Sequence, residues 1–162
     1  MSPLQTAHDA KRTSAEGRRS ARRRSAGFAG KCLLVSKEEA FLEGMKRAAS
    51  GAGWDCATSM SARDSLRRAF LHCFGLAIVD IDPSAQRQLL ADLFRILKSG
   101  SGGLVIAYDR NAEPDSELWA RQNGAWLYVP GAAEWDSLSV ACAEARRLQE
   151  RTTNRDTLGA PV

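Results

Sequence analysis

The sequence predicts an α/β domain in which five parallel strands form one open sheet with helices on both faces. Short, almost wholly apolar runs recur along the chain, and a segment with helical spacing follows each one. Continuous apolar runs are typical of strands buried on both faces, and strand–helix alternation is typical of a doubly wound sheet. The length of 162 residues, 44% of them hydrophobic, suits a single domain with its own core.

The first three strands are predicted at residues 32–35, 54–60 and 76–83. The last of these is the stretch LAIVDIDP, in which an apolar run ends in two carboxylates and a proline. A helix with apolar positions from Phe41 to Ala52 follows the first strand and stops at two glycines. A second helix, capped by Ser61 and with Phe70 on its apolar face, ends at Gly75.

The second half of the chain continues the alternation. A third helix carries Leu89 to Leu97, and the fourth strand is predicted at residues 104–108. A short helix over residues 114–122 is expected to place Leu118 and Trp119 inward. The fifth strand covers residues 125–129, and the last helix has an apolar side from Trp135 to Leu148. The domain therefore spans residues 31–150, with a short polar C-terminal tail at 151–162.

The positive charge of the chain is concentrated at its N-terminus. Residues 1–30 hold seven Lys and Arg against Asp9 and Glu16, although the net charge of the whole chain is only +4. Few large apolar side chains occur there, which predicts a disordered tail. Its arginine cluster suits nucleic acid or another polyanion, and a solubilising tail and an organelle transit peptide are the alternatives. The cluster consists of Arg18, Arg19, Arg22, Arg23 and Arg24.

Targeting and cysteine patterns favour a cytoplasmic protein. No run approaches the roughly 18 apolar residues that span a bilayer, and the N-terminus lacks the apolar region of a secretory signal. The cysteines are widely spaced, form no CxxC pair and share no metal-ligand spacing with a histidine, so reduced thiols are expected rather than a disulfide or a zinc site. They are Cys32, Cys56, Cys73 and Cys142.

Polar residues follow the predicted strands at the edge where sheets of this kind bind ligands. The third strand ends with Asp80 and Asp82, the first with Ser36 and Lys37, and the fourth with Tyr108. The carboxyl ends of parallel strands meet at one edge of the sheet, next to the switch in strand order. Asp80 is therefore the candidate for a reactive or ligand-binding group.

Taken in order and spacing, the segments from residue 31 to about 150 resemble the receiver domain of bacterial two-component response regulators. GWDCATS at residues 53–59 resembles the family's second strand, and GLAIVD at 75–80 its third, which ends in the phosphoacceptor aspartate. GAWLY at 124–128 is similar to the motif of the fifth strand. The resemblance implies a flavodoxin-like receiver fold, a signalling role and Asp80 as the candidate phosphoacceptor.

Most residues that the family places around this aspartate are replaced here. Ser36 and Lys37 stand where the family has the acidic pair that holds Mg²⁺, and Tyr108 stands where it has a Thr or Ser. The family's Lys-Pro pair is replaced by the lysine-free Val129-Pro130, whereas the aromatic Tyr128 is kept. The resemblance therefore suggests a degenerate receiver, or pseudo-receiver.

These replacements predict no resident cofactor or metal and only weak Mg²⁺ affinity at Asp80. Phosphoryl transfer to a carboxylate needs cations, and Lys37 would repel one. We hypothesise that the Lys37 ammonium lies near Asp80, where a 4 Å separation gains roughly 4 kcal/mol before desolvation. A solvated Lys37 is the alternative, as is a true phosphoacceptor with rearranged metal ligands from Asp82 or Glu38.

Two functions fit these observations. The first is an atypical receiver-like module that binds a protein partner, a histidine kinase or a regulator, independently of phosphorylation. Its partner face would comprise the last two helices and the fifth strand, with Tyr128, Trp119 and Trp135 as contact or switch residues; packed core aromatics are the alternative. The second is a single-domain response regulator phosphorylated on Asp80 in a phosphorelay.

A third class, an enzyme on a flavodoxin-like sheet, is disfavoured. No glycine-rich phosphate loop follows the first strand, and no nucleophile–base pair is visible. Nucleic acid would be reached only through the arginine tail, a membrane partner is not expected, and a homodimer is left open.

Overall fold

The computed structural model describes residues 30–81, 86–131 and 134–158, for the last three of which only the backbone is described. Five strands of this part of the chain form one parallel sheet in the order β2-β1-β3-β4-β5. The strand order reverses between β1 and β3, as in doubly wound sheets. The strands are β1 (Lys31–Val35), β2 (Asp55–Ser59), β3 (Leu76–Asp80), β4 (Leu104–Asp109) and β5 (Leu127–Pro130).

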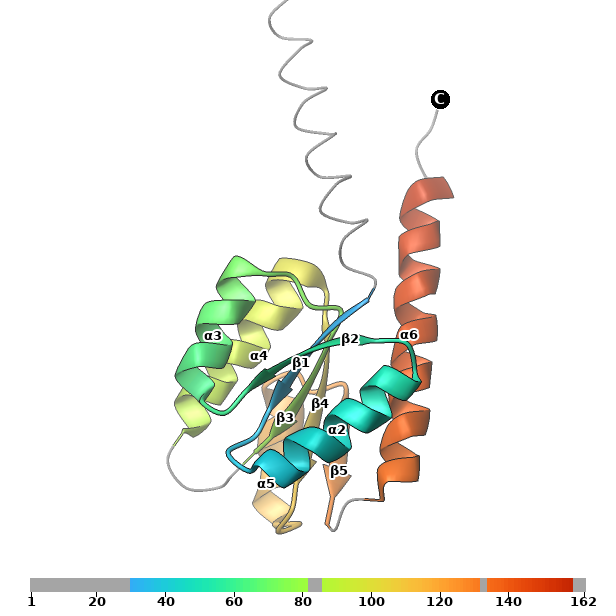
Figure 1. Cartoon of the computed structure of the whole chain (residues 1–162). Helices are drawn as coiled ribbons and strands as arrows, with labels where there is room; N and C mark the ends of the chain where they lie inside the picture. Colours follow the sequence, from blue (N-terminus) through green and yellow to red (C-terminus); the bar gives the residue numbers. More distant parts are fainter. Residues whose placement is uncertain (1–29, 82–85, 132–133, 159–162) are drawn as a thin grey trace, which may run out of the picture.

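Helices cover both faces of the sheet, so the molecule has three layers (Figure 1). α2 and α6 pack on one face, and α3, α4 and α5 pack on the other. The α/β doubly wound fold predicted from the sequence is therefore confirmed. The helices are α2 (Glu39–Gly51), α3 (Ala62–Leu71), α4 (Arg87–Ser101), α5 (Pro114–Gln122) and α6 (Trp135–Leu158).

The strand β3 shows why the sheet forms its own core. All five of its residues are buried, and their side chains alternate between the two faces. Leu76 and Ile78 pack with α2 and α6, whereas Ala77 and Val79 pack with α3, α4 and α5. Asp80 is the last residue of β3, so it lies at the edge of the sheet that carries the candidate site.

Capping fixes the start of α3 beside that edge and the end of α4 at the far edge. The Ser61 hydroxyl accepts a hydrogen bond of 3.1 Å from the Asp64 backbone N–H and so caps α3, as predicted. At the far edge, α4 ends at Gly102, whose φ of 60° lies in the left-handed region that glycine adopts without strain. None of the helices in the described ranges is long and apolar enough to cross a membrane.

The structure differs from the sequence predictions at several element ends and helix faces. α6 continues to Leu158, so residues 151–158 are helical rather than an irregular tail, because no Gly or Pro occurs between Trp135 and Leu158 to end the helix. Leu118 is 59% exposed, because Ser116 and Ala120 form the buried stripe of α5 instead. Phe70, predicted on the apolar face of its helix, is 71% exposed. The N-terminal tail, residues 1–29, lies outside the described part of the chain.

Candidate functional site around Asp80

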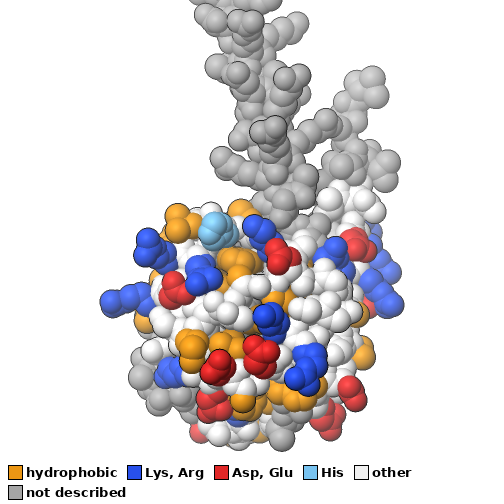
Figure 2. All heavy atoms as spheres, in the orientation of Figure 1, with side chains coloured by type: hydrophobic (Ala, Val, Ile, Leu, Met, Phe, Trp, Pro, Cys, Tyr) orange, Lys and Arg blue, Asp and Glu red, His pale blue; other side chains and the backbone are white. Residues whose placement is uncertain are grey.

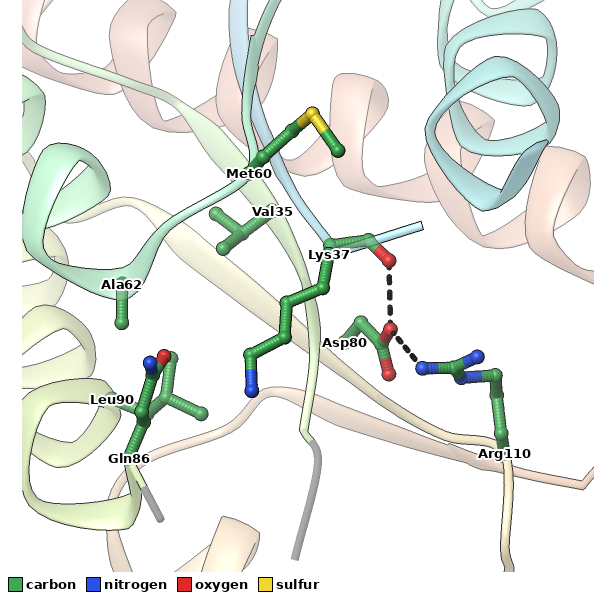
Figure 3. A pocket seen from close by; sticks show the side chains of 9 residues that line it. Val35, Lys37, Met60, Ala62, Asp80, Gln86, Leu90 and Arg110 are labelled. Atoms are coloured by element: carbon green, nitrogen blue, oxygen red, sulfur yellow. Dashed lines mark hydrogen bonds and ion pairs between the residues drawn. The ribbon is translucent and has the colours of Figure 1, made fainter. Parts of the chain in front are cut away.

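Asp80 stands at the junction of three strand ends. It is the last residue of β3, and Ser36 directly follows the neighbouring β1. The Ser36 hydroxyl donates a 2.7 Å hydrogen bond to Asp80 Oδ2, and Arg110 Nη2 lies 3.0 Å from the same oxygen (Figure 3). Arg110 directly follows β4, on the other side of β3. Because the Asp80 side chain is only 3% exposed, these contacts form in a largely desolvated setting.

Arg110 is itself held by residues at the start of α2. Its Nη1 forms an ion pair with Glu38, and its guanidinium carbon lies 4.6 Å from the centre of the Phe41 ring. The Glu38 backbone N–H donates a 3.1 Å hydrogen bond to Ser36 Oγ. This contact positions the Ser36 hydroxyl, which donates its own hydrogen bond to Asp80. Burial by itself lowers the pKa of Arg110, but the hydrogen bond with Glu38 and the charge of Asp80 more than offset it, so this pKa is raised. The guanidinium is therefore permanently charged.

A small pocket opens beside Asp80, and Lys37 lines it. Figure 3 shows the Lys37 side chain extending through the pocket past Asp80, with its ammonium end on the side of Gln86 and Leu90. Lys37 is the cation predicted to neighbour Asp80. Arg110 is a second such cation, because it forms the ion pair with Asp80 Oδ2. Lys37 and Asp80 both line this pocket. The role proposed for Lys37 stays a prediction.

A second buried carboxylate, Asp109, organises the loop after β4. It is fully buried and accepts hydrogen bonds from the Tyr128 hydroxyl at 2.9 Å and from the backbone N–H groups of Asn111 and Glu113, both at 3.0 Å. Burial raises the pKa of Tyr128, and the hydrogen bond to Asp109 adds to the effect. Tyr128 is thus held inward, 8% exposed, as a neutral donor.

Tyr108 occupies the opposite side of the sheet. Its hydroxyl donates a 2.7 Å hydrogen bond to the Gly131 carbonyl, and its ring lies 5.7 Å from that of Phe41, centre to centre. Burial raises the pKa of Tyr108, and the negative charge of Asp80 adds to this rise. Tyr108 therefore links β4 to the end of β5 through a hydrogen bond. It also packs against the Phe41 ring, which contacts the Arg110 guanidinium.

The predicted partner-face tryptophans lie on opposite faces of the sheet. Trp119 of α5 packs against Phe94, with ring centres 5.7 Å apart, and Trp135 of α6 packs against Phe41 at 5.9 Å. Both are half-buried and belong to different core clusters. The structure therefore does not bring these two side chains together, although their helices both adjoin β5 (Figure 1).

Other predicted site residues fall outside the part of the chain that is described. These are Asp82 and the tail arginines Arg18, Arg19, Arg22, Arg23 and Arg24. Their assignments as a degenerate pocket position and as a polyanion-binding cluster stay predictions.

Arg110 is the site residue that the sequence predictions missed. They considered candidate site residues at the fourth strand's end only as far as Tyr108, two residues short of Arg110. The signal was available, because the residue after β4 must lie at the same edge of a parallel sheet as the residues after β1 and β3.

The donor set around Asp80 does not fit the Mg²⁺ site that the fold family implies. Mg²⁺ takes oxygen ligands in near-octahedral geometry, usually with one or two carboxylates. Here Asp80 is paired with a guanidinium, Glu38 is turned to the same guanidinium, and Lys37 adds another cation. In the described ranges, no three Asp, Glu, His or Cys side chains are grouped so that they could hold a metal ion.

The fold has clear counterparts among solved structures. A CheY-like response regulator receiver domain from Methanospirillum hungatei matches with a TM-score of 0.66 at 20% identity, over 76% of this chain and 98% of that one. A receiver domain from Clostridium thermocellum gives 0.64 at 22% identity, over 76% and 98% of the two chains. An orphan response regulator of H. pylori gives 0.58 at 19%, over 72% and 95%.

No protein-family model matches the sequence, and no curated protein sequence matches it. At these identities the structural likeness carries the fold, which spans nearly the full length of each receiver structure. The chain therefore has the CheY-like fold of response regulator receiver domains.

Proposed function

We propose that this chain is an atypical receiver-like signalling module that acts by binding a protein partner, without phosphorylation of Asp80. One observation carries the proposal: the carboxylate at the phosphoacceptor position is already paired, through Oδ2, with Arg110 and Ser36. A carboxylate that attacks a phosphoryl group needs an available oxygen and cations placed on the incoming phosphoryl oxygens. Arg110 instead neutralises the carboxylate itself, which lowers its nucleophilicity and its need for a metal.

The fixed network suggests that the pair is a permanent structural element. Phe41 and Glu38 also contact the guanidinium. Removing Arg110 from Asp80 would therefore break several contacts at once. The alternative, a phosphorelay response regulator, is favoured by the position of Asp80 at the end of β3 beside a pocket.

The partner surface is proposed at α5, β5 and α6, the face implied by the receiver resemblance. Two apolar side chains on these helices support it, since Leu118 is 59% and Val140 71% exposed. On the face seen in Figure 2, basic and acidic side chains are interspersed without a patch of one sign. The proposal includes a cytoplasmic location, no enzymatic activity, and polyanion binding only through the N-terminal arginines.

The decisive experiment is phosphorylation of the full chain with acetyl phosphate and Mg²⁺, followed by intact mass measurement. We expect no phosphoryl adduct on the wild type, and the same result for Asp80→Ala. A response regulator that is phosphorylated under these conditions serves as the positive control. A stoichiometric, Mg²⁺-dependent adduct that disappears in Asp80→Ala would overturn the proposal in favour of the phosphorelay alternative.

The binding half of the proposal has a matched pair of variants. Val140→Asp lies on the proposed face, and Phe70→Asp, on α3, removes an apolar side chain of equal exposure, 71%, elsewhere. We expect Val140→Asp to weaken partner capture from the native cell while Phe70→Asp leaves it unchanged. The reverse result would place the partner surface on α3.

A further inference from the structure

Two cysteines that are distant in sequence face each other across the sheet. The parallel register of β1 and β2 sets Cys32 directly opposite Cys56, and both side chains point to the α2–α6 face. Neighbouring strands lie about 4.8 Å apart, within the range of roughly 4.4–6.8 Å that a disulfide spans between Cα atoms. The Cys32 thiol donates a 4.0 Å hydrogen bond to the Leu33 carbonyl, and the Cys56 thiol donates a 3.6 Å hydrogen bond to the Trp54 carbonyl, so backbone oxygens in or next to the two paired strands position both thiols.

The two thiols have different surroundings. Cys32 is fully buried in a central strand, whereas Cys56 lies on the edge strand β2, is half-buried and lines a pocket with Arg68 and His72. The Ser50 hydroxyl lies 3.6 Å from the Cys56 sulfur. Cys56 is therefore the more accessible of the two thiols.

Acidity follows the same asymmetry. The neighbouring Cys32 thiol lowers the pKa of Cys56 to about 7 by stabilising its thiolate, against the opposing effect of burial, with a further contribution from Ser50. Burial raises the pKa of Cys32 well above its ordinary value and that of Cys142 to about 12. The thiolate is the nucleophile in cysteine oxidation. Of these three thiols, the thiolate form is thus most favoured at Cys56.

We propose that Cys32 and Cys56 form a redox modification site, in which a peroxide converts the pair into an intrachain disulfide. The Cys56 thiolate attacks one oxygen of hydrogen peroxide, the O–O bond breaks, and the leaving hydroxide takes up a proton to give water. Cys56 is then a sulfenic acid. The Cys32 sulfur attacks the Cys56 sulfur, the S–O bond breaks, and the Cys32 proton leaves with the hydroxide as a second water. Two thiols are oxidised and one peroxide is reduced.

This site goes beyond the proposed signalling function and is independent of Asp80. The bond would join the edge strand β2 covalently to the central strand β1, and a dithiol reductant would reverse it. Cys142 of α6 lies near the pair but is fully buried, and Cys73 lies just beyond the end of α3. Both therefore serve as internal controls.

The test treats the reduced full chain, under native conditions, with hydrogen peroxide and then with an alkylating reagent. We expect the intact mass to fall by two hydrogen atoms with two alkylation sites lost, a peptide map that links Cys32 to Cys56, and full reversal by dithiothreitol. Cys56→Ser and Cys32→Ser should lose the link, whereas Cys142→Ser and Cys73→Ser should keep it.

Several outcomes would overturn the proposal. These are a link that uses Cys142 or Cys73, a link between two chains, oxidation that stops at a sulfenic or sulfinic acid on Cys56, or no reaction while circular dichroism shows the native fold. The wild-type peptide map decides even where a serine variant fails to fold. Alkylation of Cys56 should also rise with pH to half its maximum near pH 7, and a midpoint near that of a free cysteine would contradict the reactivity assigned to it.

Discussion

Arg110 determines what the carboxylate of Asp80 can do. A buried carboxylate without a partner is costly, and the guanidinium supplies the charge that a metal ion would otherwise provide. Because Arg110 also contacts Glu38 and Phe41, the cation is positioned before any partner or ligand arrives. The stability of the pair and the proposed lack of phosphoryl transfer to Asp80 would thus have the same physical cause.

Replacing Arg110 with Ala should destabilise the domain. The change leaves Asp80, 3% exposed at its side chain, without its ion pair, so we expect the free energy of unfolding to fall by about 2 to 3 kcal/mol in urea titrations. Arg121→Ala is the matched control, since its ion pair with Glu117 is exposed and should contribute about 0.5 kcal/mol or less.

A double-mutant cycle separates the pair from other losses. In the Asp80→Asn background the buried charge is gone, so Arg110→Ala should cost at least about 1 kcal/mol less than it does in the wild type. Equal losses in both backgrounds would show that Arg110 stabilises the domain only through Phe41 and Glu38, and not through Asp80.

At the scale of single residues, the sequence predicted where the site lies but not that Arg110 pairs with Asp80. Asp80, Ser36 and Lys37 were predictable because parallel strands bring their carboxyl ends together. The pairing of Asp80 with Arg110 was not, because a residue in a loop can turn to either of two neighbouring carboxylates, and side-chain direction is set by tertiary packing. The juxtaposition of Cys32 and Cys56 was also hidden from the sequence, since it depends on which strand pairs with β1.

Among the elements, α2 and α6 are in close contact at Gly44. A Cβ atom on Gly44 would collide with the Trp135 ring at the start of α6. That ring also packs against Phe41, 5.9 Å away between ring centres. Because Gly44 has no side chain, the first turn of α6 can lie against α2. The start of α2 is also where Glu38 and Phe41 contact Arg110.

Gly44→Ala should consequently destabilise the domain although alanine favours helix. Overpacking costs about 1 to 3 kcal/mol, which exceeds the gain of up to about 1 kcal/mol in helix propensity, so we expect a lower midpoint of thermal unfolding. Gly51→Ala, in the last turn of the same helix, meets nothing within 4 Å and should be neutral or slightly stabilising. A stabilised Gly44→Ala variant would mean that Trp135 can move aside freely.

The order and type of the elements followed from sequence, whereas some of their ends and faces did not. Alternating apolar runs and helical segments identified each strand and helix, because burial on both faces imposes that pattern. The end of α6 was misplaced because the apolar pattern stops at Leu148 while the backbone continues helical to Leu158. Leu118 was misassigned because a helix of nine residues has too few apolar positions to define one face.

At the scale of the molecule, the described part of the chain has two core clusters, one on each face of the sheet, and each contains one of the chain's two tyrosines. Tyr128 belongs to the cluster under α3, α4 and α5, and Tyr108 to the cluster under α2 and α6. Burial raises the pKa of both phenols, assisted by Asp109 at Tyr128 and by Asp80 at Tyr108. The ionisation of the two phenols therefore reports on the integrity of both cores.

Both phenols should stay protonated in the native protein at pH values where a free tyrosine, with a pKa of about 10, ionises. Since the folded state then binds more protons than the unfolded state, the free energy of unfolding falls as pH rises above about 10, and this contribution is fully present below that pH. We expect phenolate absorbance and loss of helical circular dichroism to appear in one shared transition. Tyr128→Phe should halve the absorbance change, and phenolate formation before any loss of helix would show that one core opens to solvent independently of the other.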